Sequence, residues 1–528
     1  MDTIYSESNL CLASDNKDGP LDGSIDTIDV LLVIVPFDST ATPGASKLLP
    51  MGIILLGTIL RKAGYKVKIL TGPNDVDYES KLDKIISEQT PLFIGFSVMT
   101  PQVGKAYELS QHIKEMRPDI PILWGGFHPT IFPDMTIDDP NVDIVAYGEG
   151  ASLIAPLAKA IQNNDELDHI EGILFKRDGK VVRTEKPALV ELVDLPGLDW
   201  DLIDRDVLEN FIVRCNPTGQ DVRALPILTG LGCQFLCTFC HNVIFKQTHR
   251  TLPSESIIQE MKRLRDKYDL NEVGFVDENF FGDRPRFFKL IELLEEEKLG
   301  VQWSSTMRAS DIREKFLNEK ILRRMFLAGG YYFGIGAESG SPQILRRLKK
   351  GISVEHILDA AKYSCTSGIT FTFSFMAGLP GEDIDDVFMT MDLINQIYEI
   401  NPKLLLIGPQ LFRPYPGSEL YDQALEHGLT APTSLKAWSK DIYCLDSSSH
   451  SRRLDVKTLP WLPQPEFFEK VMLCFYVSCT KRDFWRVPVL YLLPLRLMQW
   501  IAEIRIKKRL FKFMPEAFLY RLINNRMS

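Results

Sequence analysis

The chain contains little cysteine and no long apolar run. Nine cysteines in 528 residues are too few for a disulfide scaffold, and this usage fits a reducing compartment such as the cytoplasm. No run reaches the roughly 18 consecutive apolar residues of a membrane-spanning helix. The start of the chain lacks the basic and apolar stretches of a signal peptide, and it is acidic, unlike a transit peptide. We therefore expect a cytoplasmic protein whose residues 1–25 form a disordered lead-in.

Positive charge is also scarce. The formal net charge of −10 argues against a nucleic-acid partner, because nucleic-acid-binding proteins usually present a basic surface. The apolar content of 45% and the charged content of 25% are those of an ordinary globular protein. A chain of 528 residues is long enough for two or three domains, each with its own core.

Three of the cysteines lie close together, in the run GLGCQFLCTFCHN. Cys233, Cys237 and Cys240 have the spacing C-x3-C-x2-C. Iron–sulfur clusters prefer thiolate ligands, and three thiolates this close can hold one face of a 4Fe–4S cluster while the fourth iron stays open for chemistry. A zinc site and plain buried thiols are the alternatives. Zinc usually needs a second pair of ligands, and His241 follows Cys240 too closely to complete that pattern easily.

Residues 26–165 alternate short apolar runs with amphipathic stretches. The runs are IDVLLVIVPF, YKVKILT, PLFIGFSVMT, IPILWGG and VDIVAYGEG. This alternation predicts a Rossmann-like, doubly wound parallel sheet, whose ligands bind beyond the carboxyl ends of the strands. The polar residues and glycines that we expect at those ends are Ser97, Thr100, Gly125, Gly126, Gly148 and Glu149.

A second series of strands follows a short connection. Residues 166–222 indicate a hairpin with an Asp-Gly turn and an ordered linker that includes LPGLDWDLID. Residues 223–430 contain six strand-like runs, each followed by a helical stretch, which predicts a partial (β/α)6 barrel rather than a closed eight-fold one. The cysteine run falls in the loop after the first of these strands, at the face where βα barrels collect their active sites.

Residues 431–528 do not continue this pattern. From Arg482 onward, aromatic residues and leucines are mixed with many lysines and arginines. Such a segment is typical of a helix that lies in a membrane interface, and also of a helical cap on the barrel. We expect a mostly helical C-terminal region and keep peripheral membrane contact as one of its two interpretations.

The cysteine triad, with Phe239 directly before Cys240, resembles the signature of the radical S-adenosylmethionine (SAM) superfamily. The preceding domain resembles the cobalamin-binding domain of its cobalamin-dependent branch, through GFSVMT, ILWGGFHPT and VDIVAYGEG. The resemblance covers roughly residues 26–425. It implies an α/β protein with a cobalamin-binding domain, a radical SAM partial barrel and a helical C-terminal region. The implied cofactors are a 4Fe–4S cluster, SAM and cobalamin, and the electron would come from an external donor such as flavodoxin or ferredoxin.

The resemblance also implies roles for individual residues. The three cysteines would ligate the cluster, whose open iron would bind the amino and carboxylate groups of SAM, and Phe239 would pack near the adenine. The strand-end residues of the first domain would contact cobalamin. The positions that match SAM contacts in the barrel are Asp277, Glu278, Asn279, Arg308, Glu338, Ser339, Gly378 and Gly381. Each charged residue among them has a structural alternative as half of an ion pair. Their occurrence at consecutive strand ends favours binding, and for Arg308 the two interpretations are balanced.

The first domain departs from one familiar corrinoid-binding pattern. Proteins of that class supply a histidine to cobalt from the motif D-x-H-x-x-G after the first strand. The matching residues 36–44 read PFDSTATPG and contain no histidine. The resemblance therefore implies cobalamin without a protein ligand to cobalt, and we expect His128 to be a wall residue of the site.

The reaction that the resemblance implies is methylation of an unactivated carbon in a small or lipid-like molecule. A deoxyadenosyl radical made from SAM would remove a hydrogen atom, and methylcobalamin would donate the methyl group. The alternative is a cobalamin-dependent oxidative cyclase or ring-forming enzyme without methyl transfer. Methylthiotransferases are disfavoured, because residues 26–163 lack their second cysteine triad. A corrinoid or electron carrier without catalysis leaves the SAM-type residues unexplained.

Overall fold

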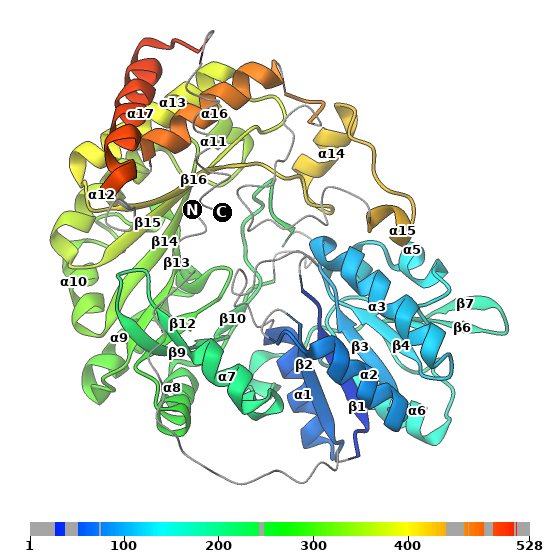
Figure 1. Cartoon of the computed structure of the whole chain (residues 1–528). Helices are drawn as coiled ribbons and strands as arrows, with labels where there is room; N and C mark the ends of the chain where they lie inside the picture. The colour runs from blue at the N-terminus through cyan, green and yellow to red at the C-terminus, as the bar shows by residue number, and fades with distance from the viewer. Residues whose placement is uncertain are drawn as a thin grey trace.

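The computed structural model describes residues 27–36, 51–72, 75–241, 248–439, 459–462, 464–479, 489–511 and 514. Within them lie two seven-stranded sheets, each covered by its own helices (Figure 1). The blue and cyan domain at the lower right comes first in the chain, and the green to yellow domain at the left follows. The predicted order of a Rossmann-like domain and a barrel-like domain is confirmed.

The first sheet is doubly wound, as predicted. Its strand order is β2-β1-β3-β4-β5-β6-β7, and β1 to β5 run parallel. The strands are β1 (Val30–Ile34), β2 (Val67–Thr71), β3 (Phe93–Ser97), β4 (Ile122–Gly125), β5 (Ile144–Ala146), β6 (Ile173–Arg177) and β7 (Lys180–Arg183). Along β1, Leu32 faces one apolar core while Leu31 and Val33 face the other, so both faces are buried. This burial explains why the strands appear in the sequence as continuous apolar runs.

Helices cover both faces of this sheet. The helices α1 (Met51–Lys62) and α6 (Ile154–Asn163) pack together on one face, and α2 (Tyr78–Glu88) and α3 (Val103–Met116) pack on the other. Two short helices, α4 (Phe127–Ile131) and α5 (Pro133–Asp138), follow β4. The hairpin of β6 and β7 turns at Asp178 and Gly179, both with positive φ, and pairs antiparallel with β5. It therefore extends the first sheet instead of standing apart.

The second sheet forms an open half-barrel. Its strand order is β16-β15-β14-β13-β12-β9-β8, in which the six strands from β9 to β16 run parallel and β8 is antiparallel. The strands are β8 (Val213–Cys215), β9 (Asp221–Ile227), β12 (Glu272–Phe275), β13 (Gln302–Met307), β14 (Gly330–Glu338), β15 (Thr370–Ala377) and β16 (Leu405–Leu411). The prediction of six parallel strands in an open barrel is confirmed.

The outer face of the half-barrel is packed by helices and aromatic side chains. The helices are α8 (Ser254–Tyr268), α9 (Arg284–Glu297), α10 (Glu319–Leu327), α11 (Pro342–Arg347), α12 (Val354–Ser367), α13 (Ile384–Ile400) and α14 (Glu419–Glu426). Phe275, Phe280, Trp303 and Phe333 lie in mutual ring contact beneath them, with centroid distances from 4.8 to 5.9 Å. This apolar layer fixes the outer face and leaves the inner face free for ligands.

The linker between the sheets is ordered and anchored. Trp200 is fully buried and stacks on Phe211 of α7 (Arg205–Ile212). Arg61 Nη1 donates to Asp199 at 2.6 Å, and the Tyr268 hydroxyl donates to Asp201 at 2.8 Å. Because Arg61 belongs to the first domain and Tyr268 to the second, the linker holds the two domains against each other.

The C-terminal region is helical, as predicted, in the residues that the structure describes. Its helices are α15 (Leu435–Trp438), α16 (Pro465–Cys479) and α17 (Val489–Lys508). α15 packs on α3 of the first domain, while α16 and α17 pack together beside α13 (Figure 1). Phe511, just after α17, stacks on Phe388 of α13 at 5.7 Å. Among the helices of the described segments, none has the length and apolar character needed to cross a bilayer.

Candidate functional site

The cysteine loop lies between two short paired strands, β10 (Gly230–Leu231) and β11 (Arg250–Thr251). Cys240 N donates to Cys237 O at 3.0 Å. Thr238 N donates to Leu348 O at 3.1 Å just after α11, and Leu420 N of α14 donates to Thr238 O at 2.9 Å. The loop is thus docked on two barrel helices, which fixes the backbone of the three cysteines.

The donor set of this loop fits an iron–sulfur cluster better than a single metal ion. None of the three thiols forms a disulfide in the described residues, and Cys237 is buried while the other two are half-buried. Burial raises the pKa of the Cys233 thiol, so a metal that replaces its proton would relieve the cost of a free buried thiolate. No three metal-binding side chains in the described residues converge on one point. The thiolates of a 4Fe–4S cluster bind different irons, so they surround the cluster and need no common point.

Arg308 brings an incompletely paired cation to this loop. It follows β13, and its Nη1 lies 3.9 Å from Cys237 Sγ. The guanidinium lies 3.5 Å from the ring centroid of Phe235. Its Nε and Nη2 are buried without a hydrogen-bond partner in the described part of the protein. Unsatisfied buried donors are rare in folded proteins, and two of them beside a cysteine suit an anionic group of a bound ligand.

Glu338 and Ser339 follow β14 beside the same loop. Glu338 has a positive φ of 64° and forms a buried ion pair with Lys350. Lys350 Nζ also lies 5.7 Å above the ring of Phe239, the aromatic residue before Cys240. Ser339 Oγ lies 3.1 Å from Thr390 Oγ1 of α13. The structure therefore brings Phe239, Arg308 and Glu338 together around the cysteines, whereas Ser339 binds a neighbouring helix.

Three residues of VDENF, which follows β12, hydrogen-bond to the cysteine loop and to the residue before β10. Asp277 is buried, and its two carboxylate oxygens accept from Thr229 N at 2.8 Å and Thr229 Oγ1 at 2.6 Å. Glu278 Oε2 accepts from Gly232 N at 3.1 Å, and Asn279 Nδ2 donates to Gln234 at 2.8 Å. Glu278 and Asn279 therefore bind the start of the cysteine loop, whereas Asp277 binds Thr229 just before β10 and pairs with Arg286 at 3.5 Å.

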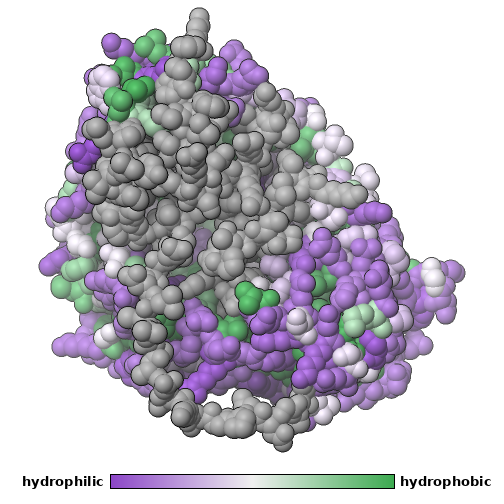
Figure 2. Space-filling view, in the orientation of Figure 1, coloured by the Kyte–Doolittle hydropathy of each residue, from purple (hydrophilic) through white to green (hydrophobic). Residues whose placement is uncertain are grey.

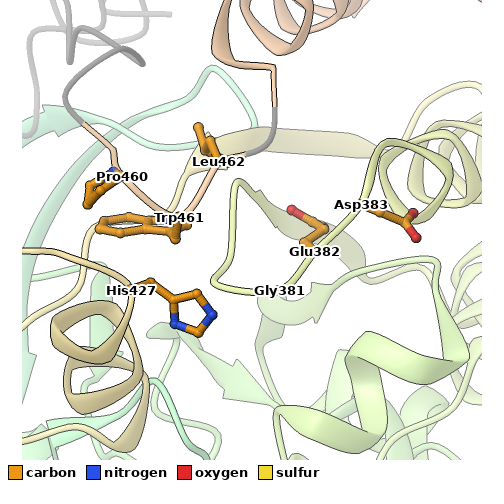
Figure 3. A pocket seen from close by; sticks show the side chains of 7 residues that line it. All are labelled: Gly381, Glu382, Asp383, His427, Pro460, Trp461 and Leu462. Carbon is orange, nitrogen blue, oxygen red and sulfur yellow. The ribbon is translucent and has the colours of Figure 1, made fainter.

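The GLPGE turn after β15 contacts the C-terminal segment. Gly378 and Gly381 have φ values of 80° and 70°, so glycine is required there. Trp461 Nε1 donates to Gly378 O at 2.8 Å. Trp461 and His427 lie on one side of an open pocket of about 420 Å³, and the turn with Glu382 lies on the other (Figure 3). The motif indicated the turn, but nothing in the sequence indicated Trp461, because the segment that carries it has no repeating pattern.

Glu382 is a buried acid that sequence reasoning missed. Its Oε2 accepts from Gly378 N and Leu379 N, while Oε1 has no partner in the described residues. Burial raises the pKa of this carboxyl to about 8. The protonated form is therefore the one that the fold favours near neutral pH.

A glutamine at position 382 should remove part of the pH dependence of stability. The native carboxyl binds its proton more tightly than the unfolded one, so its stabilising contribution is complete below about pH 4.5 and is lost as the pH rises through about 8. Glu382→Gln keeps the neutral shape at every pH. Urea unfolding at about pH 5 and about pH 9 should show a smaller loss of free energy in the variant than in the wild type. Equal losses would refute the buried neutral acid.

The strand-end residues of the first domain gather at the carboxyl edge of its sheet. Ser97 and Gly125 are paired at the ends of β3 and β4. Gly126 has a φ of 100°, and a Cβ there would lie 2.8 Å from Val98 N, so only glycine allows this turn. Gly148 N donates to Thr130 Oγ1 at 3.0 Å, which ties the loop after β5 to α4. Residues 37–44 of the stretch compared with D-x-H-x-x-G lie outside the described residues.

Thr100 and His128 lie behind this edge. Thr100 Oγ1 is 3.3 Å from His128 Nδ1, and His128 is fully buried. The rings of Phe132 and of Trp438 from α15 each lie 5.2 Å from the His128 ring. Burial lowers the pKa of His128 to about 3, so the ring is neutral. This C-terminal cover over the first domain was not expected from the sequence.

The two strand edges meet each other. Glu149, after β5, forms an ion pair with Arg250 of β11, and Phe127, after β4, lies 4.3 Å from the ring of His241, directly after the cysteines. The candidate cluster loop and the candidate cobalamin loops are therefore neighbours. Such a junction can place two cofactors against one substrate.

Comparisons with known proteins agree with this geometry. A family model of the radical SAM superfamily matches residues 227–394, and one of the B12 binding domain matches residues 42–158. An uncharacterized methyltransferase, PH0819 of Pyrococcus horikoshii, is 29% identical over 76% of this chain and 84% of its own length. The anaerobic magnesium-protoporphyrin IX monomethyl ester cyclase of Rubrivivax gelatinosus is 26% identical over 71% of this chain and 66% of its own.

Solved structures show the same architecture. The cobalamin-dependent SAM radical enzyme OxsB, solved with aqua-cobalamin bound, has a TM-score of 0.67 at 17% identity. The match covers 95% of this chain and 76% of that one. The two family models together match more than half of the present chain, in the order of its two sheets. The chain therefore belongs to the cobalamin-dependent radical SAM enzymes, whose cofactors are a 4Fe–4S cluster, SAM and cobalamin.

Proposed function

We propose that this enzyme is a C-methyltransferase that acts on an unactivated carbon of an uncharged small or lipid-like molecule. When bound, the cluster and SAM supply hydrogen-atom abstraction, and cobalamin supplies a methyl group. The inner face of the half-barrel, beside the Glu338–Lys350 pair, is the observation that carries the proposed substrate class. Its chemistry limits what kind of substrate can bind there.

Apart from the Glu338–Lys350 pair, which lies over Gly336, the following inner-face positions of the half-barrel carry uncharged side chains. Inner-face positions of neighbouring strands are Ser304, Thr306, Gly334, Ser374, Met376, Ile407 and Gln410. A Cβ at Gly334 would meet only Thr306, at 3.5 Å, so there is room above the strand. Val276 and Ile407 are 45% and 37% exposed, although both are apolar. Such a lining favours an uncharged ligand with an apolar body and a few hydroxyl or carbonyl groups.

Residues around this face would hold the cofactors. We propose that Cys233, Cys237 and Cys240 ligate the cluster and that the partnerless nitrogens of Arg308 bind the carboxylate of SAM. The pair Glu338–Lys350, beside Phe239, would contact the polar groups of SAM. Asp277, Glu278 and Asn279 would act indirectly, because each already binds the cysteine loop or Thr229 just before β10. Gly125, Gly126 and Gly148 would allow the backbone to approach cobalamin.

The test is an anaerobic product assay with SAM that carries a deuterated methyl group. The reconstituted protein, with hydroxocobalamin and a strong reductant, is offered neutral lipid fractions and small molecules. Methyl transfer predicts deoxyadenosine, S-adenosylhomocysteine and a product in which a deuterated methyl group replaces one hydrogen. Labelling only of charged substrates would refute the proposed substrate class.

A cyclase is the second candidate, supported by the identity with the cyclase of Rubrivivax gelatinosus over 71% of this chain. It predicts deoxyadenosine without S-adenosylhomocysteine, and a substrate that has lost hydrogen without gaining the label. The same assay therefore separates the two reactions.

We propose further that α17 makes peripheral contact with an anionic membrane. Leu497 and Trp500 of α17 are 56% and 59% exposed, and Figure 2 shows hydrophobic residues near the top left, where α17 lies. The basic residues Arg496, Lys507 and Lys508 are also exposed. Exposed apolar and basic groups on one helix suit a lipid surface.

Serine at positions 497 and 500 should therefore weaken flotation with vesicles that contain anionic lipid, by roughly tenfold for the loss of two anchoring side chains. The matched control is Leu327→Ser, which removes an apolar residue that is 70% exposed on α10. Equal flotation of the wild type and the double variant would exclude this contact.

A further inference from the structure

The segment that carries the cysteines is held at one end by the first domain. In the β10–β11 ladder, Leu231 lies opposite Arg250. Arg250 Nη1 donates to Glu149 Oε2 at 3.0 Å, and Nη2 donates to Glu149 Oε1. The two side chains are only 10% and 16% exposed. A bidentate pair that is largely removed from water is strong and fixes direction, so Glu149 determines where this ladder lies.

The other end of the cysteine run also contacts the first domain. His241, directly after Cys240, lies edge-on to Phe127, with ring centroids 4.3 Å apart and an interplanar angle of 72°. Phe127 follows Gly125 and Gly126, the glycines at the end of β4. A displacement of the turn at Gly126 would therefore move Phe127 against His241, the residue next to the candidate cluster ligand Cys240.

The two contacts belong to one bonded unit on the first-domain side. Thr130 Oγ1 donates to Gly126 O at 2.7 Å and accepts from Gly148 N at 3.0 Å, which joins the loops after β4 and β5. Arg250 also donates to the carbonyl of Val190 in the linker. The loops next to the candidate cobalamin site and the loop next to the cluster therefore form a continuous set of contacts.

We infer that the Glu149–Arg250 pair is a positioning contact that couples cobalamin binding to cluster loading. Each cofactor would contact a loop that this pair joins to the other loop, so each should favour the binding of the other, by the same factor. The inference gives Glu149 a role other than contact with cobalamin, and it gives Arg250 a role that its sequence context does not suggest. It rests on the cofactors of the proposed function, but not on whether a methyl group is transferred.

The test is an anaerobic titration with hydroxocobalamin, followed by visible absorption, on cluster-loaded and cluster-free protein. Cluster loading should tighten cobalamin binding to the wild type by a factor within the usual coupling range of about 5- to 150-fold. Glu149→Gln and Arg250→Met should each reduce this factor to a similar extent, and the double variant should reduce it no further. Arg177→Met, which removes an exposed ion pair of the same domain, should leave the factor unchanged.

Three outcomes would overturn the inference. One is equal cobalamin affinity of the cluster-loaded and cluster-free wild type. Another is weaker binding in Glu149→Gln with normal binding in Arg250→Met, which would place Glu149 directly on cobalamin. If circular dichroism shows that either variant is unfolded, Phe127→Leu replaces it. The third outcome is that Phe127→Leu leaves the effect of cluster loading on cobalamin affinity unchanged. No substrate is needed, so failure of the product assay leaves this result intact.

Discussion

Replacing Cys237 with alanine is expected to abolish reductive cleavage of SAM. Cys237 is the buried member of the triad. Its backbone carbonyl accepts from Cys240 N, so its position is tied to that of the third cysteine. Loss of an indirect support of a metal site typically costs about 10- to 100-fold, so loss of a ligand should cost more. Iron content, the electron paramagnetic resonance signal of the reduced cluster, and deoxyadenosine should all fall together.

Cys365→Ala is the matched control for this prediction. Cys365 is an exposed cysteine on α12, where its thiol contacts backbone carbonyls of its own surroundings. The Cys365→Ala protein should retain its iron, its cobalamin binding and its deoxyadenosine formation. A Cys237→Ala protein that keeps the signal of a 4Fe–4S cluster would show that the cluster is held elsewhere.

Replacing Lys350 with methionine is expected to lower the free energy of unfolding by about 3–5 kcal/mol. The side chains of Lys350 and Glu338 are 11% and 9% exposed, so the change leaves a carboxylate buried without its partner. The pair lies directly over Gly336, where a Cβ would come within 2.2 Å of both Glu338 Oε1 and Lys350 Nζ. Because Gly336 has no side chain, it offers no group that could pair with the carboxylate of Glu338 once Lys350 is replaced. Urea unfolding of the purified protein measures the loss.

The neighbouring lysine provides the control. Lys349 pairs with Glu419 at 2.6 Å, but the two side chains are 54% and 46% exposed. Lys349→Met should therefore cost less than about 1 kcal/mol. The double variant Glu338→Gln, Lys350→Met should recover part of the loss, because it removes both charges. Equal losses in the two single lysine variants would mean that the Glu338 pair is not effectively buried.

The sequence was sufficient for the strands and for the cysteine loop. The parallel strands of both sheets are buried on at least one face, so their apolar runs are visible without knowledge of their neighbours, whereas the edge strand β8, which is not buried, was not predicted. The three cysteines lie within eight positions of one another, so their spacing alone carries the chemistry. In both cases the information is local in the chain.

The contacts that assemble the site could not be predicted in this way. Arg250 and Glu149 are 101 positions apart, and Trp461 is 83 positions from the carbonyl that it binds. Neither pair leaves a periodic signal, because each depends on how separate elements pack. A strand-end glutamate is chemically suited both to a ligand and to an arginine, and only the fold supplies the arginine.

The half-barrel can vary in width at its open edge. In the described part of the chain, β8 and β16 each have only one neighbouring strand. The cysteine loop is anchored near β9 and β12, and also on α14, the helix that follows β16 at the opposite end of the sheet. A change in the width of the half-barrel at β16 therefore leaves the supports near β9 and β12 in place, but it must preserve the contact of α14 with Thr238.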